Sequence, residues 1–320
     1  RNLESFYFDD KYDIFLGLGA GNSGKNFLKI LKMIPSAVSI LIAAGPHPNQ
    51  SNANIKERYE YIKKRKKISV SPMRVIDFGE FDEFADSSDI ILAIGEPDQF
   101  CHRTYSMYQH KLMPYLPSSS EKLFFKESFL QTRSKKTFLC LAGDGFIVKG
   151  VDLLVEAFDQ MPDLNLVICG PNSDKDFVKA YPGVLQNTSS NIRYEGFVSI
   201  GSRKFNELLE NCGYAILPSC AEGLATSVST MMRTGMIPII TDEVGIDVST
   251  CGFLLSSKSD QIIDDIKTTC KYCADLDDHK YSHYTMKTLE QSKKYNNASF
   301  RNSIESCILE AMQIMQKKLD

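Results

Sequence analysis

Two loops of the sequence combine glycines with side chains that could bind a phosphorylated ligand. The first is Gly143-Asp144-Gly145, which follows an apolar run and leads to Lys149 at the start of a helical pattern. Loop glycines let a phosphate approach the backbone closely, and a lysine supplies a positive point charge. These four residues predict a phosphate-binding loop.

The second loop runs from Ser219 to Gly223 and carries one carboxylate, Glu222. It ends another apolar run and opens a helical pattern at Leu224. Amides in the first turn of a helix have no partner inside the helix, so the N–H groups of Gly223, Leu224 and Ala225 are expected to face an anion. The carboxylate can accept hydrogen bonds from sugar hydroxyls. Either loop alone also fits a purely structural turn, and the combination favours a ligand site.

Apolar runs alternate with helical patterns along most of the chain. In the first part the runs are 12–18, 37–44, 74–78 and 89–95, with helical patterns at 24–33, 53–67 and 97–108. In the second part the runs are 136–142, 164–169, 191–194, 214–217 and 237–241, with helical patterns at 151–160, 174–181, 202–211 and 224–234. Short continuous apolar runs are typical of parallel strands covered on both faces. We therefore predict an α/β fold with two doubly wound, Rossmann-like parallel sheets and a cleft between them.

The expected domain boundaries follow from this alternation. Residues 1–125 are predicted to form an N-terminal domain and residues 126–295 a second one, with the crossing near 116–122. The tail 296–320 is expected to form an amphipathic helix that packs back on the core, because its apolar side chains fall on one helical face. They are Phe300, Ile304, Cys307, Ile308, Ala311, Met312 and Met315.

The composition is that of a soluble globular protein, with 43% hydrophobic and 24% charged residues. The net charge of -3 gives no electrostatic reason for nucleic-acid binding. No apolar run approaches the roughly 20 residues that span a bilayer. The nine cysteines lie mostly in apolar runs, which indicates buried, reduced thiols and a cytoplasmic location.

Residues 136–241 resemble the donor domain of retaining GT-B glycosyltransferases, especially glycosyltransferase family 4 (the group 1 glycosyl transferases). The resemblance rests on the ordered segments GDGFIVKGVDLLVEAFDQMPDLNLVICGP, NIRYEGFV and LPSCAEGLATSVSTMMRTGMIPIIT. Upstream, VSILIAAGPHP and FADSSDIILAIGEPDQFCHRTY resemble the second half of the acceptor domain in some members. The resemblance implies metal-independent transfer, with retention, from a nucleoside diphosphate sugar to a glycan or lipid-linked acceptor. Surface polysaccharide or glycolipid biosynthesis would be the setting, and no further cofactor is implied.

The resemblance also implies roles for single residues. Lys149 would hold the donor phosphates, and Glu222 would bind the sugar hydroxyls. The amides of Gly223, Leu224 and Ala225 would lie near both the phosphate and the sugar.

Other positions would complete the donor site. Phe197 and Val198 would frame the base through their backbone, and Gly170 would line the same site. His47 would face the transferred sugar or the acceptor from the first domain and is the catalytic candidate there.

Two positions depart from the family pattern. Gly143-Asp144-Gly145 stands where an arginine usually precedes the lysine, which removes one phosphate cation. Thr230 replaces a glutamate that binds the ribose, and its hydroxyl makes one hydrogen bond where a carboxylate makes two. The first strands of an acceptor domain are not apparent before Tyr12, so we expect a shortened first domain. These departures leave an alternative function open, in which the protein binds a nucleotide sugar or a partner without catalysing a reaction.

Three further patterns suggest other functions. Residues 19–26 nearly match the phosphate loop GxxxxGK[ST], with Asn26 in place of the hydroxyl residue, which would make the chain a P-loop-like nucleotide-binding enzyme through Lys25. A run of five cations could contact anionic lipids at a membrane surface, and its members are Lys63, Lys64, Arg65, Lys66 and Lys67. A zinc-type pattern is formed by Cys270, Cys273, His279 and His283, and its spacing is shorter than in a zinc finger.

Overall fold

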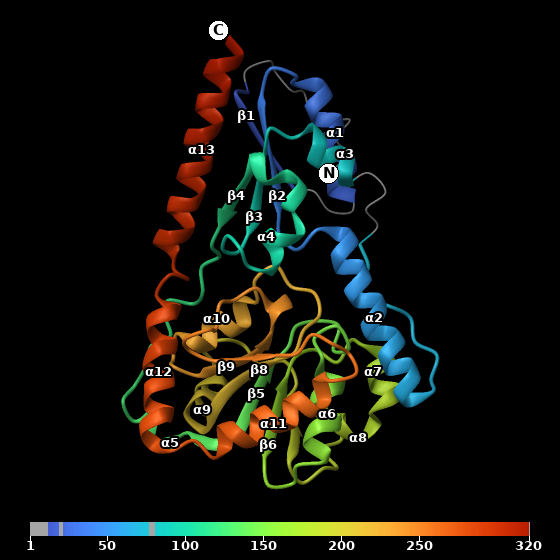
Figure 1. Cartoon of the computed structure of the whole chain (residues 1–320), viewed down its shortest axis with the longest axis vertical. Coiled ribbons are helices and arrows are strands. Elements are labelled where there is room, and N and C mark those ends of the chain that lie inside the picture. The colour runs from blue at the N-terminus through green and yellow to red at the C-terminus, as the bar shows by residue number, and fades with distance from the viewer. Residues whose placement is uncertain (1–11, 19–21, 77–80, 320) are drawn as a thin grey trace.

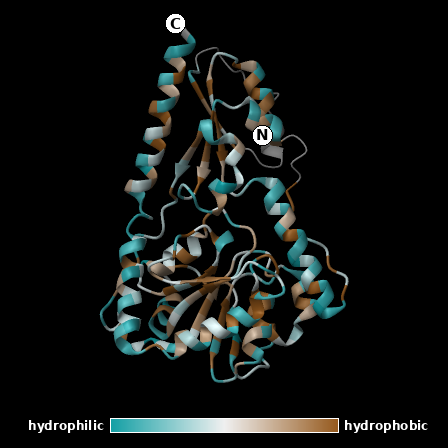
Figure 2. Ribbon diagram, in the orientation of Figure 1, coloured by the Kyte–Doolittle hydropathy of each residue, from teal (hydrophilic) through white to brown (hydrophobic). Residues whose placement is uncertain are grey.

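The chain folds into two parallel β-sheets, each covered by helices (Figure 1). This computed structural model describes residues 12–18, 22–76 and 81–319. The first sheet has four strands and the second has six. Figure 2 shows hydrophobic strands in both sheets and helices in which hydrophilic and hydrophobic residues alternate. The predicted α/β fold with two parallel sheets is confirmed.

The first sheet has the strand order β1-β2-β3-β4, which follows the chain. Its strands are β1 (Ile14–Leu18), β2 (Val38–Ala43), β3 (Ile90–Ile94) and β4 (Leu112–Tyr115). The connections hold α1 (Asn22–Met33), α2 (Pro48–Lys66), α3 (Phe81–Ser87), α4 (Phe100–Thr104) and the 3-10 helix η2 (Ser106–Lys111). Each strand is added on the same side of the one before it, and right-handed crossovers then place all the connecting helices on one face of the sheet. The opposite face of the sheet must be covered by another element.

The C-terminal helix α13 (Asn297–Leu319) provides that cover (Figure 1). Its Cys307 and Ala311 are buried against Ile40 and Leu92, while the neighbouring strand residues face the connecting helices. At the end of α13, Lys318 Nζ lies 2.8 Å from Asp89 Oδ1. The last helix of the chain thus ties the C-terminus to the first sheet.

The Asp89 carboxylate is expected to make this docking sensitive to acid. Burial raises the pKa of Asp89, but the Lys318 ammonium and hydrogen bonds from the Ser39 N–H (2.8 Å) and hydroxyl (3.0 Å) outweigh it, so the pKa lies below its ordinary value. The stabilisation is therefore complete above pH ~4 and is lost as the pH falls below that value. Asp89→Asn should lower the free energy of unfolding at pH 7 by about 1–2 kcal/mol, measured by urea denaturation.

The matched control is Asp278→Asn, because this carboxylate is 98% exposed beside Lys135. It should change stability by less than about 0.5 kcal/mol. Equal effects of the two substitutions at pH 7 would refute the role of Asp89.

The second sheet has the order β10-β9-β8-β5-β6-β7, and all of its strands are parallel. The strands are β5 (Ser134–Leu141), β6 (Asn165–Cys169), β7 (Ile192–Tyr194), β8 (Cys212–Leu217), β9 (Ile237–Thr241) and β10 (Phe253–Leu255). Its helices are α5 (Phe129–Thr132), α6 (Val151–Asp159), α7 (Lys175–Ala180), α8 (Pro182–Leu185), α9 (Arg203–Asn211), α10 (Thr226–Met232), η3 (Asp242–Val244), α11 (Ile262–Ala274) and α12 (Asp278–Ser292). The order reverses between β5 and β8, and such a switch point is where α/β sheets bind ligands.

Several predicted elements differ from the structure. The strand predicted at 74–78 is wrong for residues 74–76, which form a loop, and residues 77 and 78 lie outside the described residues. Arg74 has a φ of 61°, a left-handed conformation that a strand does not contain. The sequence patterns also missed β4 and β10, whose strands are only four and three residues long.

Helix α2 reaches from the first sheet to the second domain (Figure 1), where its last turn forms ion pairs with α6. Arg65 Nη2 lies 2.5 Å from Asp152 Oδ2, and Lys66 Nζ lies 3.3 Å from Glu156 Oε1. Nearer the sheet, the Arg58 guanidinium donates to the Pro218 carbonyl at 3.0 Å. These contacts fix the two domains against each other.

These ion pairs correct the prediction of a five-cation patch. Arg65 and Lys66 are used inside the molecule, and Lys63, Lys64 and Lys67 remain exposed. Among the described helices, none is long and apolar enough to cross a membrane. All nine cysteines lie in the described ranges, and they are buried and unpaired as predicted.

Candidate functional site

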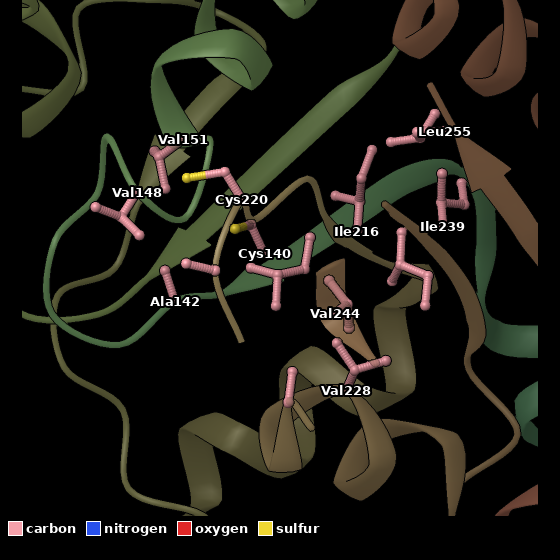
Figure 3. Packing of buried hydrophobic residues seen from close by; sticks show 14 of the residues in the cluster. Cys140, Ala142, Val148, Val151, Ile216, Cys220, Val228, Ile239, Val244 and Leu255 are labelled. Carbon is pink, nitrogen blue, oxygen red and sulfur yellow. The ribbon is translucent and has the colours of Figure 1, made fainter. Parts of the chain in front are cut away.

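The two glycine-containing loops lie side by side at the switch point of the second sheet. The Val148 carbonyl accepts hydrogen bonds from the Cys220 N–H at 3.0 Å and from the Ser219 hydroxyl at 3.2 Å. Figure 3 shows Val148 and Cys220 packed above Cys140 and Ala142 at the end of β5. A buried apolar floor therefore holds the loop after β5 against the loop after β8.

Gly150 is the point of closest approach between these loops. It is the N-cap of α6 with a φ of +74°, and an added Cβ would lie 2.3 Å from the Pro218 carbonyl oxygen. The backbone carbonyl cannot move without displacing Arg58, which donates to it. Only glycine fits here, and its fit places Lys149 beside the second loop.

Gly150→Ala is accordingly expected to destabilise the protein by about 2–4 kcal/mol, through the left-handed backbone and the contact with Pro218. Gly201→Ala is the matched control, because Gly201 has a φ of +80° but nothing within 4 Å of an added Cβ. It should cost about 1 kcal/mol. Urea denaturation of both variants measures the difference, and an equal loss would show that the Pro218 contact has no effect.

Glu222 is the centre of the site, and its oxygen Oε1 collects three partners. The Lys149 ammonium forms a short ion pair with it, the Ser219 hydroxyl donates to it at 2.7 Å, and Arg74 Nη1 lies 3.7 Å away. Lys149 and Glu222 are each only 9% exposed. The other oxygen, Oε2, has no hydrogen-bond partner within the described ranges, so it can accept from a ligand.

The backbone amides of the second loop divide into used and free groups. The Glu222 N–H donates to the Glu243 carbonyl at 3.1 Å, and the Ala225 N–H donates to the Val244 carbonyl at 3.1 Å. The expectation of a free amide at Ala225 is therefore wrong, and α10 starts at Thr226, later than predicted. In the part of the chain that the structure describes, the N–H groups of Gly223 and Leu224 have no partner.

A cavity of about 450 Å³ lies between the two domains and contains Glu222 in its wall. The second domain contributes Ala221, Glu222, Gly223 and Leu224. The first domain contributes Ile42, Ala43, Ala44, Gly45, Pro46, Pro48, Ser51, Ile55, Arg74, Ile76, Phe81 and Tyr105. A Cβ added to Gly223 would lie 2.3 Å from Ile94 Cγ2 and 3.0 Å from the Ala44 carbonyl oxygen, so the domains touch directly beside the cavity.

His47 lies next to this cavity but does not line it. Its Nε2 is 3.0 Å from Asp82 Oδ1, and its Nδ1 accepts from the Asn49 N–H at 3.3 Å as the N-cap of α2. Only 4% of the residue is exposed, and its ring packs against Phe81 and Tyr105. Both ring nitrogens are therefore engaged in the first domain, and the expectation that His47 faces the sugar stays a prediction.

The first loop is held by a carboxylate that the sequence analysis missed. Asp174 accepts from the Ile147 N–H at 3.1 Å and from the Phe177 N–H at 3.0 Å, so it links the Lys149 loop to the start of α7. Burial raises the pKa of Asp174 above its ordinary value. Asp144 accepts from the Gly145 N–H at 3.0 Å and from the Ser173 hydroxyl. An acidic residue at a helix start is the only sequence signal for this role.

The remaining predicted donor residues do not line the cavity. The Gly170 N–H donates to the Gly196 carbonyl at 2.9 Å, which joins the loops after β6 and β7. Phe197 is 76% exposed, whereas Val198 is buried. Thr230 is buried inside α10. Gly143 and Gly145 border Lys149 and Arg74 respectively, where an added Cβ would lie 3.8 and 3.1 Å from them.

The P-loop-like segment and the zinc-type pattern are the two alternative ligand sites. Residues 19–21 of the P-loop-like segment lie outside the described residues, as does the side chain of Lys25, while α1 begins at Asn22. For zinc, no group of three or more His, Cys, Asp or Glu among the described side chains could hold a metal ion. Cys270 and Cys273 are buried in α11, whereas the two histidines belong to α12. The zinc alternative is therefore wrong.

Comparisons with known proteins agree with this arrangement. Residues 124–265 match the family model of glycosyl transferases group 1. Comparison with curated protein sequences finds no significant match. The pneumococcal O-GlcNAc transferase GtfA has a similar structure, with a TM-score of 0.63 and 15% identity over 94% of this chain and 57% of its own. This chain thus spans 57% of the length of that transferase.

Two other solved structures are similar over a larger share of their length. HepE from Anabaena gives a TM-score of 0.64 with 13% identity over 93% of this chain and 79% of its own. Sucrose-phosphate synthase from Thermosynechococcus elongatus gives 0.63 with 13% identity over 96% and 74%. At these identities the likeness concerns the fold, and the family model concerns the second domain. The chain therefore has the GT-B fold, and its similarity to the group 1 glycosyl transferases lies in residues 124–265.

Proposed function

We propose that this protein transfers a sugar from a nucleoside diphosphate sugar to an acceptor. The observation that carries the proposal is the buried Lys149–Glu222 pair at the switch point, beside an interdomain cavity and with Glu222 Oε2 unpaired among the described residues. The group 1 family model supports it. So do the ligands of similar structures, which are UDP and GlcNAc for the pneumococcal transferase, UDP-glucose for HepE, and ADP and acarbose for starch synthase IV from Arabidopsis thaliana.

The geometry suggests how the parts would act. Lys149 and the N–H groups of Gly223 and Leu224 would hold the diphosphate, and Glu222 Oε2 would accept hydrogen bonds from the sugar hydroxyls. The acceptor oxygen forms a bond to the anomeric carbon while the bond from that carbon to the phosphate oxygen breaks. The departing phosphate takes the acceptor proton, so no side-chain base is needed, in keeping with the engaged ring of His47. We propose that the acceptor enters on the face that the diphosphate leaves, which retains the anomeric configuration.

The proposed setting is the synthesis of a surface polysaccharide or glycolipid, with a glycan or lipid-linked acceptor. Because Lys149 supplies the positive charge at the leaving group, we propose that transfer needs no metal ion. The rate of transfer in the presence of EDTA should equal the rate in added Mg²⁺. A rate that falls at least about 10-fold with EDTA and recovers with Mg²⁺ would contradict this point.

A thermal-shift screen against a panel of nucleoside diphosphates and nucleotide sugars tests the proposal. A ligand at about 100 times its dissociation constant adds ~2.7 kcal/mol to the free energy of unfolding. The nucleotides that carry the preferred base should therefore raise the melting temperature by several degrees. The best donor should then release its nucleoside diphosphate when acceptors are added. A shift by ATP alone, lost in Lys25→Ala, would favour the P-loop-like alternative.

Binding without transfer is the second candidate function. It is favoured by Thr230, which is buried in α10 and offers no carboxylate for the ribose. A nucleotide sugar that binds but is neither transferred nor hydrolysed with any acceptor would support this candidate over the transferase.

A further inference from the structure

Arg74 reaches into the donor cavity from the opposite domain. Among the described residues that line the cavity, Arg74 and Glu222 are the charged ones. The Arg74 side chain is 38% exposed, and its Nη1 lies 3.7 Å from Glu222 Oε1. Its stem runs beside the first loop, where a Cβ added to Gly145 would lie 3.1 Å from Arg74 Cδ. This cation therefore stands between the two loops that carry Lys149 and Glu222.

The segment that carries Arg74 is held on both sides. The Ser71 N–H donates to Asp176 Oδ2 of the second domain at 2.7 Å. On the other side, the Asn52 side-chain amide donates to the Ile76 carbonyl at 2.8 Å, and the Ile76 N–H donates to the Asn52 side-chain oxygen at 2.9 Å. Arg74 itself has a φ of 61°, which costs a non-glycine residue about 1 kcal/mol or more. A strained arginine between two fixed points is placed more rigidly than a surface cation.

Among Glu222, Lys149 and Arg74, the positive charges outnumber the negative one. Lys149 and Arg74 bring two positive charges to one carboxylate, Glu222, and both contact the same oxygen atom. One positive charge is left over in a partly buried site. A diphosphate carries the opposite charge, and a guanidinium can bind two of its oxygens at once.

We propose that Arg74 binds the diphosphate of the donor, so that one ligand is held by cations from both domains. The inference rests on the proposed function, because it assigns a contact within the same donor site. When the donor enters, Arg74 exchanges Glu222 for the phosphate oxygens, and Glu222 is released to the sugar hydroxyls. Donor binding then favours the closed arrangement in which a cation from each domain lies beside Glu222.

The test compares Arg74→Gln, Arg74→Lys and the control Arg103→Gln, using the full chain and isothermal titration calorimetry. Arg103 also forms an interdomain ion pair, with Asp242, but lies outside the cavity lining. The probes are UDP, GDP and ADP, and the tightest of them is compared with its nucleoside. Arg74→Gln should weaken the diphosphate at least about 10-fold and leave the nucleoside affinity unchanged. Arg74→Lys should recover part of the loss, and Arg103→Gln should bind like the wild type.

The outcomes separate the two proposals. If the wild type binds a nucleoside diphosphate and Arg74→Gln binds it equally well, the role of Arg74 is refuted and the proposed function stands. An equal loss for the diphosphate and the nucleoside would also refute it, since a general distortion of the site would be the cause. If the wild type binds no nucleoside diphosphate and no nucleotide sugar, the proposed function itself fails.

Discussion

Replacing Lys149 with methionine is expected to slow sugar transfer by about 100- to 1,000-fold, the usual loss when one charge-stabilising donor is removed from an active site. Methionine keeps an unbranched apolar stem in the buried space but removes the ammonium that pairs with Glu222. The leaving diphosphate would lose its nearest cation in the second domain. Release of nucleoside diphosphate under saturating donor and acceptor measures the effect.

The control for this substitution is Lys126→Met. Lys126 is 48% exposed and pairs with Glu210 on the surface, so its loss should leave turnover within about twofold of the wild type. Near-native turnover in a folded Lys149→Met variant would show that Lys149 does not act on the leaving group. The melting temperature of each variant shows whether it is folded.

The second large effect is expected for Asp152→Ala, which should lower the free energy of unfolding by about 3–5 kcal/mol. Asp152 is 0% exposed, and its carboxylate pairs at 2.5 Å with Arg65, which α2 brings from the first domain. Removing the carboxylate leaves a largely buried guanidinium with Glu156 as its remaining acidic partner. Urea denaturation at pH 7 gives the loss directly.

A double-mutant comparison sharpens this prediction. Arg65→Met combined with Asp152→Ala should cost less than the sum of the single substitutions, because no unpaired charge is left buried. Glu210→Ala is the surface control and should cost less than about 1 kcal/mol, since both partners of its ion pair are half-exposed. A loss below about 1 kcal/mol in Asp152→Ala would show that this pair does not hold α2 to the second domain.

The parts of the site that follow local patterns could be predicted from the sequence. Gly143, Lys149 and Glu222 each follow an apolar run, and the carboxyl ends of parallel strands share one edge of a sheet. Whether β8 lies next to β5 is not a local property, because β6, β7 and their crossovers separate these two strands in the chain. The structure supplies that adjacency, which brings the Lys149 loop against the Glu222 loop.

Contacts made across the chain could not be predicted in this way. Arg74 lies in a segment that was predicted as a strand, and only the tertiary arrangement brings it to Glu222. The Ala225 N–H donates a hydrogen bond to the Val244 carbonyl, and no local sequence pattern predicts this contact. The cation run 63–67 was treated as one patch, although five consecutive helical residues are spread over more than one full turn. Arg65 and Lys66 face the second domain, whereas Lys63, Lys64 and Lys67 are exposed.

The most direct test of the donor site is calorimetric titration of the wild type, Lys149→Met and Glu222→Gln with the preferred nucleotide sugar and its nucleoside diphosphate. The wild type should bind both ligands, and Lys149→Met should weaken both, because the phosphate contact is shared. Glu222→Gln should bind the nucleoside diphosphate with unchanged affinity. It should bind the nucleotide sugar at least about 10-fold more weakly, because only the sugar contacts Glu222 Oε2. Equal affinities in all three proteins, or no nucleotide-sugar binding by the wild type, would contradict a donor site built on Lys149 and Glu222.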